Sequence, residues 1–163
     1  MFHLFKKKEA PAIVLGAPMK GKAVELKEVS DPTFGEGMLG KGVAIIPTEG
    51  KVYAPIDGEI GLVFDTLHAI SLISTEGAEV LIHVGLDTVQ MKGEAFEAHV
   101  QTGDSVKKGD LLLTVDLEKI KAAGYDTITP IIICNTDDYE DVQALTAEGI
   151  EPGADVLKLL LKK

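Results

Sequence analysis

Apolar residues along this chain fall into short runs separated by Gly, Pro, Asp and Ser. The runs are rich in Val and Ile, and each is shorter than a typical helix. They are Val43–Ile46, Ile60–Phe64, Ile70–Ile73, Val80–Val84, Leu111–Val115, Ile131–Cys134 and Val156–Leu161. Many short strands with turn residues every ~8–12 positions are typical of an all-β fold. We therefore expect an antiparallel barrel-sandwich.

The segment Asp116–Ala123 is the one stretch that predicts a helix. Asp is favoured at the start of a helix because its side chain accepts a hydrogen bond from a free backbone N–H. Gly124, directly after the segment, is a common helix terminator. We expect one or two short helices in an otherwise all-β domain that spans residues 11–163, after a flexible tail at residues 1–10.

Two stretches of the chain resemble each other, Ala17–Val24 and Ala54–Gly61. In each, Pro starts a turn, Gly supplies an unusual φ angle, and a strand follows. A second style of turn is shared by Val100–Val115 and Gly149–Leu157. We interpret these echoes as a duplicated β unit, with chance similarity of turn residues as the alternative.

Two histidines lie in the most informative part of the chain. Strands predicted at Gly61–Ser74 and Ala78–Gly85 flank a tight turn. If Thr75 pairs with Ala78, His68 and His83 are diagonal neighbours on one face, with Cα atoms ~7–8 Å apart. A two-residue shift keeps them on that face, whereas a one-residue slip would separate them.

Each histidine alone would be an ordinary core or surface residue, which is how we interpret His3 and His99. A pair is less easily explained, because burying two neighbouring imidazoles costs stability. Gly85 would leave the His83 ring open to a partner. The surrounding Phe64, Ile70, Leu81 and Val89 would form an apolar collar that keeps the imidazole pKa low, or an ordinary barrel core.

Charge and composition exclude several functions. The 163 residues include 26 acidic side chains, and all 16 basic ones are Lys, for a formal net charge of −10. Nucleic-acid binding needs the opposite charge. The absence of Arg removes the usual bidentate phosphate clamp, so any phosphate must be held by another side chain. The single Cys134 permits no internal disulfide and favours the cytoplasm.

The first residues, MFHLFKKK, lack the apolar core of a secretory signal, and no apolar stretch approaches the ~18 residues of a membrane span. Three Lys in residues 1–8 could give weak peripheral contact with an anionic membrane, but so short a segment makes a poor helix. A flexible start is the alternative.

The histidine segments resemble a known family. Gly77–Val89 (GAEVLIHVGLDTV) and Thr66–Ala69 (TLHA) are similar to the signatures of the glucose-type IIA components of the bacterial phosphoenolpyruvate:sugar phosphotransferase system (PTS). Agreement extends in colinear order over about residues 11–163, through Asp31–Phe34, Gly40–Ile45, Ala54–Gly58, Lys92–Glu94, Val115–Leu117 and Thr129–Ile131. The resemblance implies a single EIIA type 1 domain with a duplicated hybrid motif.

The resemblance also implies a function. Such a phosphotransferase component accepts a phosphoryl group from the phosphocarrier HPr and passes it to the IIB domain of a glucose-family sugar permease, which drives sugar uptake. It implies His83 as the acceptor, His68 as the residue that supports the phosphoryl group, Thr66 as its orienter and Asp87 at the rim. No cofactor is required, and regulatory protein targets are a further expectation.

The implied partner-binding residues are Phe34, Phe64, Ile70, Leu81, Gly85 and Val89. Departures from the family pattern are Leu67, where many relatives carry a polar residue, and Ile70 and Leu81, where some carry Phe. These departures leave the chemistry intact but put the identity of the partner in doubt.

Parts of the sequence also resemble two other classes of protein. Met19-Lys20 echoes the modified turn of biotinyl and lipoyl carrier domains, but Gly21 follows where those domains carry a hydrophobic residue. A zinc hydrolase would need an H-x-H ligand pair, which the sequence lacks. His68 and His83 could still bind zinc at a protein interface, with a carboxylate from the partner, as a regulatory contact.

Overall fold

A computed structural model describes residues 11–162 of the chain. The flexible tail predicted at residues 1–10, with its weak membrane contact, lies outside the described residues, as does Lys163. The strands are β1 (Ala12–Gly16), β2 (Gly21–Glu25), β3 (Lys41–Pro47), β4 (Lys51–Tyr53), β5 (Gly58–Val63), β6 (Ala69–Ser74), β7 (Glu79–His83), β8 (Phe96–Ala98), β9 (Ser105–Val106), β10 (Leu111–Val115), β11 (Thr129–Ile133), β12 (Tyr139–Ala144), β13 (Ala147–Ile150) and β14 (Asp155–Leu161).

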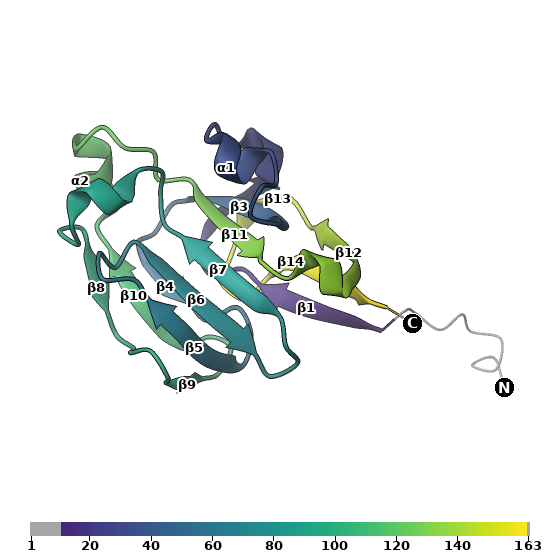
Figure 1. Ribbon diagram of the computed structural model, residues 1–163. Coiled ribbons are helices and arrows are strands. Elements are labelled where there is room, and N and C mark those ends of the chain that lie inside the picture. Colours follow the sequence, from purple (N-terminus) through teal and green to yellow (C-terminus); the bar gives the residue numbers. More distant parts are fainter. Residues whose placement is uncertain (1–10, 163) are drawn as a thin grey trace, which may run out of the picture.

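The strands form three antiparallel sheets, which confirms the predicted all-β class (Figure 1). The largest has the order β13-β2-β3-β11-β7-β6-β5-β9, and the smaller ones have the orders β1-β14-β12 and β4-β10-β8. None of these sheets closes on itself, so the molecule is a sandwich of open sheets. Within residues 11–162, no helix is long and apolar enough to cross a membrane.

Both α-helices are short, as predicted. Helix α2 spans Leu117–Ala122, and Asp116 caps it by accepting a hydrogen bond from the Lys119 N–H at 3.0 Å. Helix α1 spans Pro32–Gly35 and is capped in the same way by Asp31. Single 3₁₀ turns lie at η2 (Leu26–Glu28), η3 (Thr88–Met91) and η4 (Thr136–Asp138).

The internal echo is a structural repeat. The backbone of Ala17 exchanges two hydrogen bonds with Gly153–Ala154, at 2.9 and 2.7 Å. Ala54 exchanges the equivalent pair with Gly109–Asp110, at 2.9 and 2.8 Å. The two Ala-Pro turns also bond directly to each other, at 2.9 and 2.8 Å. Chance similarity of turn residues does not produce matching bonds at four sites, so the duplication is confirmed.

Two apolar clusters hold the sheets together. The main cluster takes residues from all three sheets, among them Leu15, Ile70, Ile82 and Leu112, each fully buried. The second cluster packs η2 and α1 against the large sheet, and includes Leu26, Val29, Phe34, Ala44, Leu86, Ile128 and Ile132. This second cluster fixes α1, with Phe34, beside the end of β7 (Figure 1).

The hairpin that carries the histidines differs from the prediction in two ways. The predicted strand Gly61–Ser74 is two strands, β5 and β6, joined by a loop at residues 64–68. The register of β6 and β7 is shifted by one residue, so that Ala69 lies opposite His83. The turn has three loop residues instead of two, because Gly77, at φ 96°, supplies the left-handed residue that such loops need.

Candidate functional site

Four rings stand next to one another where β7 ends. The rings of His68 and His83 pack edge to face, with centroids 4.9 Å apart and an interplanar angle of 82°. Phe34 packs on His83 at 4.8 Å, and Phe64 packs on His68 at 5.6 Å. His68 is only 5% exposed, and His83 is half-buried. The two histidines therefore share a partly dry site, flanked by aromatic rings.

The pair forms for a different reason from the one predicted. In the observed register, strict alternation would place His68 and His83 on opposite faces of the sheet. His68, however, lies in the loop before β6, where the backbone is not extended. The loop carries the His68 ring to the end of β7, so the predicted proximity holds although the predicted register is wrong.

A backbone carbonyl sets the state of the His83 ring. The carbonyl oxygen of Gly85 lies 2.8 Å from His83 Nδ1. Because a carbonyl oxygen only accepts, Nδ1 must carry the proton in this contact. In the neutral ring, Nε2 is then unprotonated, and its lone pair is available for attack.

The second histidine is held by a hydroxyl. Thr66 Oγ1 lies 2.6 Å from His68 Nδ1. When the hydroxyl donates to Nδ1, the His68 proton sits on Nε2. The ring is then able to donate a hydrogen bond from the nitrogen that Thr66 leaves free.

Burial keeps both rings neutral at pH 7. Burial, and to a smaller extent the neighbouring His83, together lower the pKa of His68 from 6.5 to about 4. Burial also lowers the pKa of His83, although the Gly85 carbonyl, Asp31 and Asp87 act in the opposite direction. A neutral imidazole is the nucleophilic form, so burial favours reactivity here.

The structure gives Gly85 a more specific role than leaving the His83 ring open to a partner. It is buried, and its φ of 79° lies in the left-handed region. A Cβ atom at this position would lie 2.6 Å from the Thr88 side chain and 2.8 Å from the Asp126 carbonyl oxygen. Glycine therefore lets the chain turn sharply after β7 and present its carbonyl oxygen to His83.

The predicted collar is partly correct. Phe64 and Leu81 are half-buried near the histidines, and Val89 is 43% exposed. Ile70, expected in the collar and among the partner-binding residues, instead lies in the main cluster at 0% exposure, because the shifted register places it opposite the buried Ile82. Phe34 is buried, but its ring packs on His83.

One residue near His83 was missed. Asp31 raises the pKa of His83 together with Asp87, an exposed residue that the sequence had placed at the rim. Asp31 also caps α1 through a hydrogen bond of 3.0 Å from the Thr33 N–H. Asp before Pro at a helix start is a signal for a cap, but this local signal does not indicate that Asp31 lies near His83.

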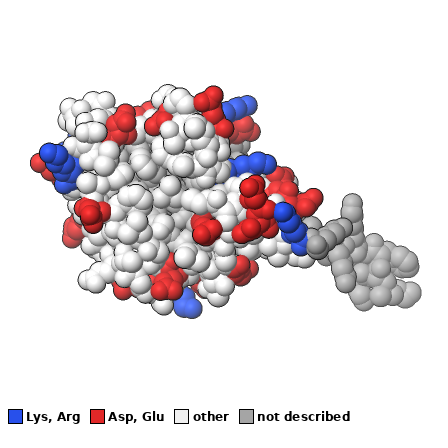
Figure 2. All heavy atoms as spheres, in the orientation of Figure 1, with Lys and Arg blue, Asp and Glu red and all other residues white. Residues whose placement is uncertain are grey.

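The surface over the front sheet is largely uncharged. Figure 2 shows a broad uncharged area across the face that carries β5, β6 and β7, with carboxylates scattered around it. Leu62 and Ile73 lie on this face and are 46% and 48% exposed. Such a surface suits a protein partner more than a small ligand.

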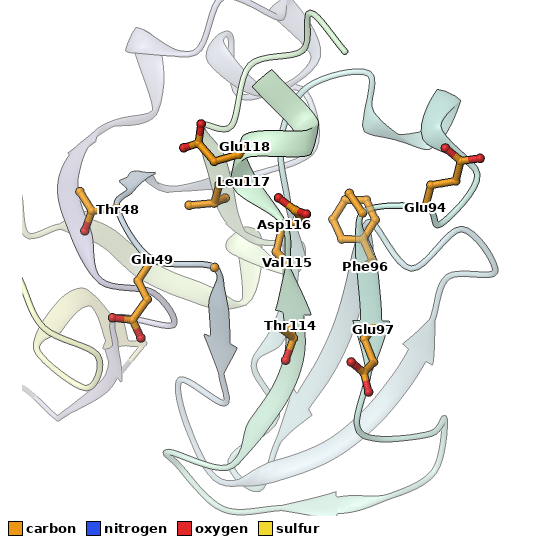
Figure 3. A pocket seen from close by; sticks show the side chains of 12 residues that line it. Thr48, Glu49, Glu94, Phe96, Glu97, Thr114, Val115, Asp116, Leu117 and Glu118 are labelled. Carbon is orange, nitrogen blue, oxygen red and sulfur yellow. The ribbon is translucent and has the colours of Figure 1, made fainter. Parts of the chain in front are cut away.

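A cavity of about 720 Å³ lies elsewhere, between β10, β8 and α2. Its walls carry Glu49, Glu94, Glu97, Asp116 and Glu118, and neither histidine of the pair lines it (Figure 3). Among the described residues, no group of three or more His, Cys, Asp or Glu side chains is placed to hold a metal ion. The histidine pair is therefore the candidate functional site.

Known proteins match the chain over most of its length. The family model described as "phosphoenolpyruvate-dependent sugar phosphotransferase system, EIIA 1" matches residues 13–139. A glucose-specific EIIA component of Bacillus cereus is 47% identical over 163 residues, covering 99% of this chain and 98% of that protein. The glucose permease IIA of Mycoplasma capricolum superposes with a TM-score of 0.83 at 33% identity, covering 94% of this chain and 97% of that one.

Other relatives carry this domain inside longer proteins. A beta-glucoside-specific EIIBCA component of Dickeya chrysanthemi is 48% identical over 146 residues. The match covers 90% of this chain but only 23% of that protein, so the chain spans about a quarter of its length. With the fold, the repeat and the histidine pair in agreement, the chain belongs to the EIIA type 1 family of the sugar phosphotransferase system, whose glucose-type members are phosphotransferase relay proteins.

Proposed function

We propose that His83 accepts a phosphoryl group from phosphorylated HPr on Nε2 and passes it to the IIB domain of a glucose-family sugar permease. The observation that carries the proposal is the Gly85 carbonyl at 2.8 Å from Nδ1, beside the His68 ring at 4.9 Å. Together these contacts leave one nucleophilic nitrogen and place a donor next to it. The relatives fused to IIB and IIC domains are consistent with this direction of transfer.

The transfer is an exchange of one phosphorus–nitrogen bond for another. The lone pair of His83 Nε2 attacks phosphorus in line with the donor histidine, and the donor's bond to phosphorus breaks as the new bond forms. In the second transfer, to the IIB domain, His83 is the phosphoryl donor and its ring is the leaving group. Because the first step breaks one phosphorus–nitrogen bond and forms another, that step is near-balanced and needs no cofactor.

His68 supplies what Arg would supply in other phosphate sites. With Thr66 donating to Nδ1, the His68 Nε2–H points its hydrogen bond toward the phosphoryl oxygens on His83. A donor buried at 5% exposure acts in a low dielectric, where the hydrogen bond to a charged oxygen is stronger than in water. His68 therefore stabilises the phosphoryl group without taking it.

Partner docking uses the face around the pair. Phe64, Leu81 and Val89 offer apolar surface, and Phe34 supports the His83 ring from behind. The net charge of −10 favours association with basic surfaces on both partners. An on-rate that falls steeply with salt is the expected signature.

A zinc ion at a partner interface is a second candidate for the same rings. His83 Nε2 and a His68 nitrogen provide two ligands, and a tetrahedral site needs four. Since the described residues supply no cluster of three, a partner must supply the rest. Calorimetry with Zn²⁺ on the wild type and on His68→Ala, with and without a carboxylate-bearing partner, tests this regulatory role.

A biotinyl or lipoyl carrier role has little support in the structure. Met19 is fully buried, and Lys20 pairs with Glu151 at 3.6 Å. We further propose that the protein works in the cytoplasm, where a free exposed thiol such as Cys134 persists. Regulatory protein targets would use the same apolar face.

Reconstitution with phosphoenolpyruvate, enzyme I and HPr, followed by a panel of IIB domains, tests the function. His83→Ala is expected to abolish phosphorylation, whereas His68→Gln is expected to accept the group but transfer it poorly. Full phosphate incorporation into His83→Ala would overturn the assignment of the acceptor.

A further inference from the structure

Leu67 has a left-handed backbone conformation, with φ 58°. Among the described residues only Asp87 and Lys92 share this property without being glycine. The conformation costs an L-amino acid roughly 1–2 kcal/mol, and Gly or Asn usually occupies it. Leu67 stands between Thr66 and His68, the two residues whose side chains bond to each other.

The hairpin loop between β5 and β6 requires this conformation. The Leu67 N–H donates to the Phe64 carbonyl oxygen at 2.8 Å, which closes a turn. The Phe64 N–H then donates to the Ala69 carbonyl oxygen at 3.1 Å, which rejoins the two strands. Hairpin loops built on such a turn commonly end in a left-handed residue.

Packing holds Leu67 in place. Its side chain is half-buried and packs against the main apolar cluster. Burial of a Leu side chain is worth up to ~1.5–3 kcal/mol, which offsets the backbone cost. A polar residue at this position would satisfy the backbone but would lose the contact with the core.

The conformation of Leu67 determines how Thr66 and His68 face each other. In an extended strand, residues two apart are separated by roughly 6.6 Å along the backbone. The left-handed residue curls the chain, so that Thr66 Oγ1 reaches 2.6 Å from His68 Nδ1. The same curl brings the His68 ring against His83 across the shifted register.

We propose that Leu67 is a positioning residue for phosphoryl transfer: its left-handed backbone fixes the Thr66–His68 bond and aims His68 Nε2 at the group on His83. Leu67 does not touch the phosphoryl group. The expected effect on transfer from His83 rests on the proposed function. The fixed orientation of the His68 ring does not, because it is a property of the unphosphorylated protein.

The test compares Leu67→Val with Leu67→Asn. Val keeps an apolar side chain but strongly disfavours the left-handed region, whereas Asn tolerates that region and loses the packing. Nitrogen-15 NMR of the histidine rings reports the tautomer of His68 without any phosphate. Leu67→Val is expected to lose the fixed Nε2–H tautomer, and Leu67→Asn is expected to retain it.

Kinetics provide the second measurement. In Leu67→Val, transfer from phosphorylated His83 to a IIB domain is expected to fall roughly tenfold to a hundredfold, because misplacing a catalytic group by about 1 Å has this effect. Leu67→Asn is expected to transfer at close to the wild-type rate despite a lower melting temperature. Slow transfer in Leu67→Val but not in Leu67→Asn would show that the backbone conformation of Leu67, and not the stability of the fold, controls the transfer rate.

Gly149→Val is the matched control. Gly149 has φ 59° and open space around it, so Val there imposes the same backbone strain far from the histidines. It is expected to lower the melting temperature and to leave the His68 tautomer and the transfer rate unchanged. A wild-type tautomer and wild-type transfer in folded Leu67→Val would overturn the proposal. Failure of HPr to phosphorylate the wild type would overturn the proposed function instead, and the NMR result would stand.

Discussion

His83 Nδ1 donates a hydrogen bond of 2.8 Å to the carbonyl oxygen of Gly85, two residues further along the chain. This contact selects the nitrogen that can react. It depends on a sharp turn after β7 that only glycine accommodates, because a side chain there would collide with Thr88 and with the Asp126 carbonyl.

Gly85→Ala is therefore expected to destabilise the fold by about 2 kcal/mol or more, through the left-handed φ and the close contacts. Urea unfolding measures the change. Gly124→Ala is the control, because Gly124 has a similar φ of 87° with open space around it. Equal losses in the two variants would show that the collision at Gly85 is absent.

The low pKa of His68 makes stability depend on pH. Burial, then the proximity of His83, lowers the pKa to about 4, whereas the unfolded chain protonates near 6.5. Between these values the unfolded state binds more protons, so the free energy of unfolding falls as pH falls from 6.5 toward 4, by about 1–3 kcal/mol. Above pH 6.5 the ring contributes no pH dependence.

Urea unfolding across this pH range, for the wild type and for His68→Gln, isolates the contribution. The variant is expected to lose the part of the slope that His68 causes. An unchanged slope would mean that His68 titrates normally in the folded state.

Phosphorylation of His83 should also persist into mildly acidic solution. The neutral ring is the nucleophile, and burial lowers its pKa below 6.5. We expect the rate of phosphorylation by HPr to stay on its plateau at pH 6.5 and to decline only at lower pH. Rapid-quench assays with pH-matched controls on the donor check this, and a midpoint at or above 6.5 would contradict it.

The exposed apolar pair on the front sheet predicts a docking effect. Ile73 lies four residues along β6 from Ala69, the residue that pairs with His83. This corresponds to roughly 13 Å along the strand, so Ile73 and His83 fit within one standard protein interface. Ile73→Lys is expected to lower the second-order rate of transfer roughly tenfold, because it removes an exposed apolar side chain and adds a positive charge on a face expected to meet basic partners. Glu59 and Glu79 lie opposite Ile73 on either side, so the folded protein accommodates the Lys.

Ile46→Lys provides the comparison. Ile46 is 42% exposed on β3, opposite Lys22, away from the hairpin of the histidines. Its substitution is expected to leave transfer unchanged. A similar loss in both variants would point to a general effect of charge instead of a local interface.

The duplication and the strand content could be predicted from sequence because turn residues are local signals. Pro and Gly in the two Ala-Pro turns, and the Asp116 cap of α2, act within a few residues of themselves. The all-β class followed from short apolar runs for the same reason.

The register of the hairpin could not be predicted, because two and three loop residues are both compatible with Thr75-Glu76-Gly77. The third residue moves Ile70 from the collar into the core. The proximity of His68 to His83 survived because it depends on the loop at residues 64–68, and no alternation rule describes a loop. Asp31 was missed since its position beside His83 is set by packing of α1 on the large sheet.

The ends of the described chain lie together, where β1 pairs with β14 and Leu161 bonds to Pro11 at 3.0 Å. Figure 1 shows this edge on the opposite side of the molecule from α2 and the end of β7. A tether attached here leaves the histidine face free. In a fused chain, such a tether would make delivery to an attached IIB domain an intramolecular event, at an effective concentration on the order of millimolar for a short flexible linker.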